Sequence, residues 1–104
     1  MRLYLNRKNG VTAIAEYDET AGSFTVLKGS KISESVAHSE KFRGAKSIEK
    51  SRAGTVSDGT VIRDVVFKSS STAANYVTGA STNGLTAWKD ESGRSLKEIL
   101  SGKE

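Results

Sequence analysis

The apolar residues of this chain fall into short runs, and glycine-containing turn signals separate the runs. Three dipeptides typical of tight turns mark the breaks: Asn9-Gly10, Asp58-Gly59 and Asn83-Gly84. Val11–Tyr17 and Ser23–Lys28 show the alternation of strands, and a short glycine-containing loop joins them. We therefore predict that these two segments form a hairpin and start a small sheet.

Three more segments carry strand signals. Arg2–Leu5 is rich in β-forming residues, and Leu85–Lys89 holds the single tryptophan. Val61–Phe67 is β-branched with apolar residues on both faces, which predicts a central strand. Gly29 follows the second strand of the hairpin and predicts a bend or bulge there.

Helical spacing alternates with these strand signals. It predicts one helix over Ala45–Ala53, ended by Gly54, and a second over Thr72–Thr78. Ser95 and Glu98 form a capping-box pattern that opens a short C-terminal helix. Strands and helices intermix without enough βαβ units for a doubly wound sheet. We therefore predict an α+β fold, with a small antiparallel or mixed sheet and two to three short helices on one side.

The composition limits the chemistry available to the chain. Its 104 residues predict a single domain, residues 1–104, with little room for an enclosed active site. Cysteine is absent, which excludes disulfides, Cys-ligated zinc and iron–sulfur clusters. The net charge of +4 favours polyanions, although many small domains carry such a charge for solubility alone. We expect neither a cofactor nor a bound metal.

Catalytic signals are weak. The single histidine, His38, lies in the polar stretch 33–43, and a Gly-x-Ser-x-Gly elbow is absent. The clustered carboxylates fall at expected turns, where they stay solvated: Glu16, Asp18, Glu19, Asp90 and Glu91. We therefore expect no enzymatic activity. Arg2 is followed by only three apolar residues, and no apolar run spans a membrane, so we expect a soluble cytoplasmic protein.

Several ordered segments resemble a known family. Phe24–Ser30 is similar to its F-x-V-L-K-G-S signature, and Phe67–Ala74 to its F-x-S-P-S-x-A-A segment. The pattern from Gly79 to Lys89 matches G-x-x-x-N-G-x-x-x-W-K. These segments resemble the DUF4357 family, small domains of unknown function often found C-terminal to GIY-YIG nucleases. The resemblance covers about residues 17–100, with Ser70 standing where the family usually has proline.

The resemblance implies a role beside nucleic acid. The chain is also similar, more distantly, to a domain that accompanies restriction and adenine-methylation enzymes. We therefore expect a non-catalytic accessory module, with DNA and a nuclease or methylase protein as partners, and no nuclease activity of its own. The candidate contacts are cations, hydroxyls, an amide and an aromatic ring: Lys28, Lys31, Lys68, Ser69, Ser70, Ser71, Asn83, Trp88 and Lys89.

Two alternatives stay open at this stage. Trp88 is either a base-stacking residue or a core residue, and a lone tryptophan in a small domain favours the core. The module as a whole is either a nucleic-acid binder or a protein-interaction domain that uses an exposed strand edge. The sequence leaves the oligomeric state open.

Overall fold

The computed structural model describes residues 1–7, 10–33 and 45–101. His38 and nearly all of the polar stretch 33–43 lie outside the described residues, as does Asn9 of the first predicted turn. Among the described residues, no helix combines the length and the apolar character that a membrane span requires.

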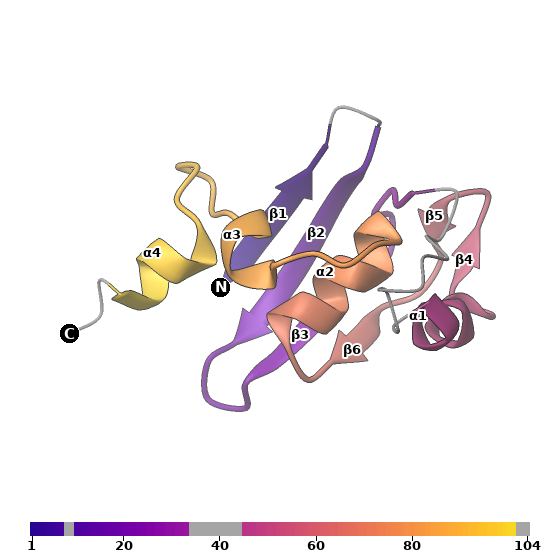
Figure 1. The fold of residues 1–104 in the computed structure, drawn as a ribbon, viewed down its shortest axis with the longest axis horizontal. Coiled ribbons are helices and arrows are strands. Elements are labelled where there is room, and N and C mark those ends of the chain that lie inside the picture. Colours follow the sequence, from indigo (N-terminus) through magenta and orange to yellow (C-terminus); the bar gives the residue numbers. More distant parts are fainter. Residues whose placement is uncertain (8–9, 34–44, 102–104) are drawn as a thin grey trace.

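Four strands form the main sheet, and every neighbouring pair is antiparallel. The strand order is β1-β2-β3-β6 (Figure 1). The strands are β1 (Arg2–Asn6), β2 (Thr12–Asp18), β3 (Ser23–Val26) and β6 (Val65–Phe67). A second, two-stranded sheet pairs β4 (Val56–Ser57) with β5 (Thr60–Val61). The predicted hairpin of the second and third strands is confirmed.

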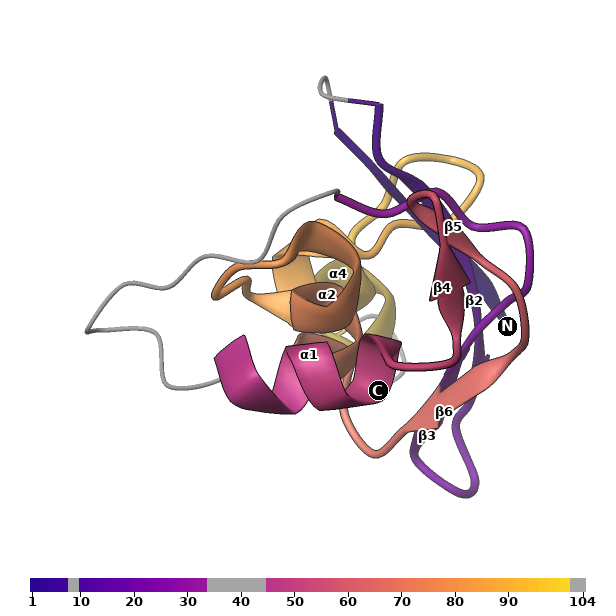
Figure 2. The same cartoon turned by 90° about the vertical axis from the view of Figure 1, so that its right-hand side faces the viewer.

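The described part of the chain contains four helices, all on one face of the main sheet (Figure 2). They are α1 (Ala45–Arg52), α2 (Ser70–Thr78), α3 (Gly84–Ala87) and α4 (Leu96–Ser101). The predicted α+β fold with helices on one side is confirmed. The structure has four helices in place of the predicted two to three, because the segment from Gly84 to Ala87 forms α3 where a turn and a strand were predicted.

The core lies between the inner face of the sheet and α2. Alternating residues of β1, β2 and β3 point toward the helices and are fully buried: Leu3, Leu5, Ala13, Ala15, Phe24 and Val26. Ala73 and Ala74 of α2 lie in this core and are 0% exposed. Their small side chains let the helix lie close to the strands, and larger rings fill the space around them.

The prediction of one central strand over Val61–Phe67 is wrong. The segment forms two short strands, and β6 lies at the edge of the sheet. Residues 62–64 separate them, and an Asp64 carboxylate oxygen accepts a 2.8 Å hydrogen bond from the Lys28 N–H. This side-chain bond replaces a backbone bond that would otherwise join Lys28 to the segment, so the strand is interrupted in its middle.

The predicted bulge at Gly29 is confirmed. Gly29 adopts φ +94°, β3 ends at Val26, and the chain rejoins β2 at Lys31. The Ile14 carbonyl keeps its ladder bond from the Leu27 N–H at 2.9 Å, but the displaced backbone leaves the Ile14 N–H to the buried Ser30 hydroxyl. This hydroxyl accepts from the Ile14 N–H at 3.0 Å and donates to the Ile14 carbonyl at 3.3 Å.

Replacing Ser30 by alanine is expected to destabilise the fold by about 1–3 kcal/mol, because it leaves the part-buried Ile14 N–H unpaired. Urea unfolding measures this loss. Ser81→Ala, at an exposed position, is the matched control and is expected to change stability by less than about 0.5 kcal/mol. Equal stability of the two variants would contradict the role of the Ser30 hydroxyl.

Candidate nucleic-acid interface

One edge of the sheet is partly closed by the segment that follows α3. The Tyr4 N–H donates to the Lys89 carbonyl at 2.7 Å, and the Lys89 N–H donates to the Tyr4 carbonyl at 2.9 Å. This bridge fixes Lys89 beside β1. The prediction of a strand over Leu85–Lys89 is therefore wrong for most of its length, since the segment first forms α3 and joins the sheet only at Lys89.

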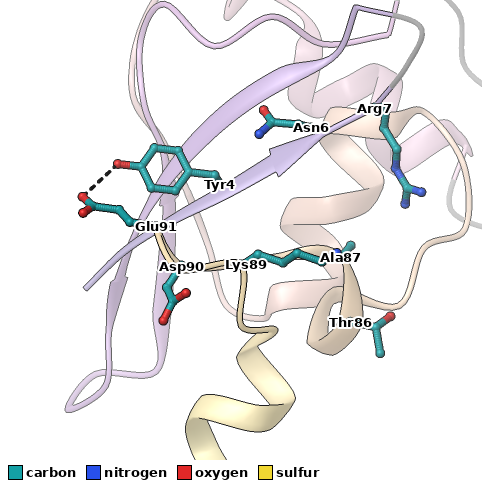
Figure 3. Close-up of a pocket in the computed structure, with 9 residues that line it drawn as sticks. Tyr4, Asn6, Arg7, Thr86, Ala87, Lys89, Asp90 and Glu91 are labelled. Atoms are coloured by element: carbon teal, nitrogen blue, oxygen red, sulfur yellow. Dashed lines mark hydrogen bonds between the residues drawn. The ribbon is translucent and has the colours of Figure 1, made fainter.

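The bridge forms the floor of an open cavity of about 470 Å³, here called the β1-edge groove. Its lining comes from β1, from α3 and from the turn after Lys89 (Figure 3). The lining residues are Tyr4, Asn6, Arg7, Thr86, Ala87, Lys89, Asp90, Glu91 and Gly93. The groove therefore gathers two cations, an amide, a hydroxyl and a phenol ring from distant parts of the chain.

The two carboxylates of the groove differ in how firmly they are held. Asp90 accepts hydrogen bonds from the Ser92 and Arg94 N–H groups, each at 2.9 Å, and from the Arg94 guanidinium at 3.1 Å. The backbone bond from Arg94 is the main cause that lowers the pKa of Asp90 below its ordinary value. Glu91 accepts from the Tyr4 hydroxyl at 3.4 Å. The Arg94 charge offsets that of Asp90.

Trp88 is a core residue, so its alternative role in base stacking is wrong. Its side chain is 0% exposed, and its ring lies 5.7 Å from the Phe24 ring, centroid to centroid. The indole N–H donates to the Ser70 carbonyl at the start of α2, at 3.0 Å. Trp88 therefore joins α2, α3 and the sheet and offers no face to a ligand.

The predicted hydroxyl and amide contacts serve as helix caps. The Ser69 hydroxyl accepts from the Thr72 N–H at 3.1 Å and so caps α2. The Ser71 hydroxyl accepts from the Gly84 N–H at 3.2 Å, and the Asn83 amide caps α3 by accepting from the Leu85 N–H at 3.0 Å. These groups hold α2 and α3 in place, which is a structural reason for their presence.

The predicted lysines do not form one patch. Phe24 pairs with Phe67, and Val26 pairs with Val65, so β3 and β6 run in opposite directions. Lys68 therefore lies at the opposite end of this strand pair from Lys28. Lys31 bridges Thr12 and Thr60, on the β3 side of the sheet, whereas Lys89 borders β1. Of the nine predicted contacts, only Lys89 lines the β1-edge groove.

Sequence reasoning did not single out four further polar residues of the groove: Tyr4, Asn6, Arg7 and Thr86. No local signal could have found them, because the groove exists only once Tyr4 pairs with a residue near the other end of the chain. The two-residue period of β1 does place Tyr4 and Asn6 on the face opposite Leu3 and Leu5. The shared face of Tyr4 and Asn6 could therefore be predicted from the strand itself.

Comparison with known proteins identifies the fold's family. Residues 3–100 match a family described as a domain of unknown function, DUF4357. The chain belongs to the DUF4357 family. The match begins in β1, well before Tyr17, where the sequence signatures suggested that the resemblance starts. No curated protein and no solved structure matches this DUF4357 domain.

The signatures that carried the resemblance are explained by folding. Gly29 and Ser30 build the bulge, Ser69 and Asn83 cap helices, and Trp88 fills the core. In this DUF4357 domain these residues maintain the scaffold. The groups free to meet a ligand therefore lie elsewhere, and the β1-edge groove is where polar side chains of several kinds converge.

Proposed function

We propose that this DUF4357 domain is a non-catalytic accessory module that binds nucleic acid through the β1-edge groove. One observation carries the proposal: Arg7, Lys89 and the ring of Tyr4 line one open cavity, together with amide and hydroxyl groups. Cations and hydroxyls are the usual partners of phosphate oxygens, and an accessible aromatic ring offers a stacking surface to an unpaired base.

The charges in the groove support this assignment. Arg7 and Lys89 are exposed, and Arg94 offsets the nearby charge of Asp90. A negatively charged backbone therefore meets two cations at the groove, and within the described part of the chain no carboxylate forms an ion pair with either. Glu91 opposes binding where it stands, but its contact with Tyr4 is long, and the Glu91 side chain is exposed and free to turn away.

The resemblance of the signatures to nuclease-associated domains supports a setting in DNA restriction, modification or cleavage. In that setting the module would place a nuclease or methylase partner protein on its substrate.

A protein-interaction role is the second candidate. Val66 lies on the edge strand β6, and its side chain is 65% exposed. In the ladder with β3, the backbone groups of Val65 and Phe67 face β3, so those of Val66 face outward. An apolar residue on an open strand edge is a feature that favours a protein partner.

Binding to oligonucleotides tests the first proposal. Single-stranded, double-stranded and adenine-methylated DNA are titrated with the protein at about 50 and about 200 mM salt, and anisotropy is measured. Arg7→Ala and Lys89→Ala are each expected to weaken binding about 5–10-fold. Each should also reduce the slope of log affinity against log salt concentration by about one, the value of one lost phosphate contact. Only the Lys89 side chain is lost, so the backbone bridge to Tyr4 is retained.

Lys50→Ala is the matched control, because Lys50 is an exposed cation on α1 and does not line the groove. It is expected to bind DNA within about twofold of the wild type, as a cation outside the site should. Equal losses of DNA affinity for Lys50→Ala and Lys89→Ala would mean that DNA is attracted by the overall positive charge and not bound in the β1-edge groove. Absence of binding to all three DNAs at low salt would refute the proposed function.

A further inference from the structure

Tyr4 differs from the other described aromatic residues because no other ring covers its ring. Most of the others are buried in the core: Phe24, Phe67, Tyr76 and Trp88. Tyr17 is partly exposed, but its ring stacks on Phe24 with 4.7 Å between the ring centroids. The Tyr4 ring is partly exposed, lines the β1-edge groove and has no aromatic contact in the described part of the chain. It is therefore the described ring that a ligand can reach.

The backbone bridge places a cation next to that ring. Tyr4 and Lys89 exchange two backbone hydrogen bonds, at 2.7 and 2.9 Å, so they are direct cross-strand partners whose side chains leave the same face of the sheet. Arg7 lies three residues beyond Tyr4, about 10 Å away at the rise of a strand. In the view of Figure 3 the Tyr4 ring and the Arg7 guanidinium lie at opposite ends of the groove, with Lys89 between them. The groove thus has an aromatic end and a cationic end.

The acidic residues of the groove determine which end suits a phosphate. The hydroxyl at the tip of the Tyr4 ring donates to the Glu91 carboxylate at 3.4 Å, so this carboxylate lies beyond the tip and not over the ring face. The charge of Asp90 is offset by the Arg94 guanidinium at 3.1 Å. A phosphate is therefore repelled from the aromatic end and attracted to the cationic end, whereas a neutral base can occupy the aromatic end.

The size of the groove suits one nucleotide. Cavities of about 300–1,000 Å³ hold small ligands, and the groove measures about 470 Å³. An unpaired nucleotide offers both a flat base that stacks on an aromatic ring and a phosphate that pairs with a cation. In a duplex the neighbouring base pairs cover each base face, so a base reaches the Tyr4 ring only if it leaves the helix. A duplex would therefore contact the cations alone.

We infer that the β1-edge groove selects single-stranded DNA, with an unpaired base stacked on Tyr4 and the adjoining backbone held by Lys89 and Arg7. This inference rests on the proposed function and deepens it, because it names the form of DNA that the groove accepts. The selection opposes the effect of charge, since a duplex releases more counterions per phosphate contact than a single strand does. Tyr4 thus determines specificity, whereas Arg7 and Lys89 supply affinity for either form.

Fluorescence anisotropy with three ligands of one sequence tests the inference on the full chain. The ligands are a single strand of about ten nucleotides, its duplex, and the same strand with abasic sites in place of its bases, all at about 50 mM salt. The abasic strand keeps every phosphate and loses every base, so it is the matched control for stacking. The intact single strand is expected to bind at least about 5-fold more tightly than the duplex and the abasic strand, which is the effect of one stacked base.

Variants of Tyr4 show whether its ring causes the preference. Tyr4→Leu keeps the backbone bridge to Lys89 but has no ring, so its affinity for the single strand should fall at least about 5-fold. Its affinity for the duplex, which depends on the cations, should change less than about twofold. Tyr4→Phe restores the ring without the hydroxyl and is expected to recover the preference for the single strand. Tyr4 is partly exposed, and circular dichroism verifies that both variants fold.

The outcomes separate this inference from the proposed function. Suppose that Arg7→Ala and Lys89→Ala weaken binding, but the wild type binds the single strand no more tightly than the duplex or the abasic strand. The inference is then overturned and the proposed function stands. The same follows if Tyr4→Leu binds the single strand as tightly as the wild type does. A chain that binds none of the three ligands, or normal binding by both cation variants, would overturn the inference and the proposed function together.

Discussion

Replacing Gly84 by alanine is expected to destabilise the domain by about 3 kcal/mol or more, although alanine normally favours a helix over glycine by about 1 kcal/mol. Gly84 opens α3 and lies directly against the first turn of α2. A Cβ atom at Gly84 would overlap the carbonyl group of Ser70 and the nitrogen of Ser71. These are backbone atoms, so the overlap is relieved only if the two helices move apart.

Separation of the helices would cost more than the overlap itself. The Gly84 N–H donates to the Ser71 hydroxyl, and the Trp88 indole N–H donates to the Ser70 carbonyl at 3.0 Å. Both bonds cross the contact that the new methyl group would open. Trp88 is fully buried, so its shift would also disturb the packing against Phe24.

Urea unfolding of Gly84→Ala, beside Gly22→Ala, separates this effect from the general cost of replacing glycine. Gly22 has φ +71° in a turn, with no atom near its would-be Cβ, so alanine there should cost about 1 kcal/mol of backbone strain alone. A Gly84→Ala domain as stable as the wild type would show that α2 and α3 are not packed as closely as described.

The contact at Gly84 illustrates what the sequence could and could not predict. Asn83-Gly84 was interpreted as a turn because this dipeptide favours hairpins. The same two residues also suit a helix start, where Asn83 serves as the cap and Gly84 permits close approach. Local chemistry fits both structures. The tertiary partner, the first turn of α2, decides between them and lies thirteen residues earlier than Gly84, at Ser71.

Elements with strong local signals were predicted well. The β2–β3 hairpin, the bulge at Gly29 and helix α2 each depend on residues close in sequence. The predicted strand Val61–Phe67 failed because a side chain from its own middle, Asp64, takes the place of a backbone bond to Lys28. The β-propensity of the segment does not reveal such a replacement, since the replacement depends on where the neighbouring strand bulges.

The candidate site was harder to predict than the fold. Functional residues were sought among signature residues, and these proved to be caps, a bulge and a core tryptophan. The β1-edge groove instead joins Tyr4 to Lys89, which no local pattern links. Sequence signatures of a small domain therefore indicate how it folds more readily than what it binds.

Arg52 provides the second large expected effect. Arg52 is the last residue of α1, and its side chain turns toward α2. Its Nε and Nη2 atoms donate to the Tyr76 carbonyl at 3.1 and 2.7 Å, and Nη1 donates to the Ser33 carbonyl at 2.9 Å. The guanidinium also lies 5.9 Å from the centre of the Tyr76 ring. Arg52 thus joins three segments of the chain.

The charge of Arg52 fits the position of its acceptors. Tyr76 belongs to the last turn of α2, where carbonyl oxygens lack helical partners and the helix dipole favours a cation. Burial lowers the pKa of Arg52 from its ordinary value, but the group stays charged throughout the pH range in which stability is measured. Its acceptors are neutral carbonyls, so added salt should weaken the contact little.

Arg52→Ala is expected to destabilise the domain by about 3 kcal/mol, because it removes several charge-assisted hydrogen bonds and the packing on Tyr76. Arg52→Lys keeps the charge but not the planar fork that reaches two carbonyls at once, so it should cost about 2 kcal/mol. Lys50→Ala, at an exposed position two residues earlier in α1, should cost less than about 0.5 kcal/mol. Urea unfolding at low and high salt measures all three. If Arg52→Lys were as stable as the wild type, the positive charge alone would hold α1 to α2. If high salt removed the stability difference between Arg52→Ala and the wild type, the contact would be a screened ion pair and not a set of hydrogen bonds to neutral carbonyls.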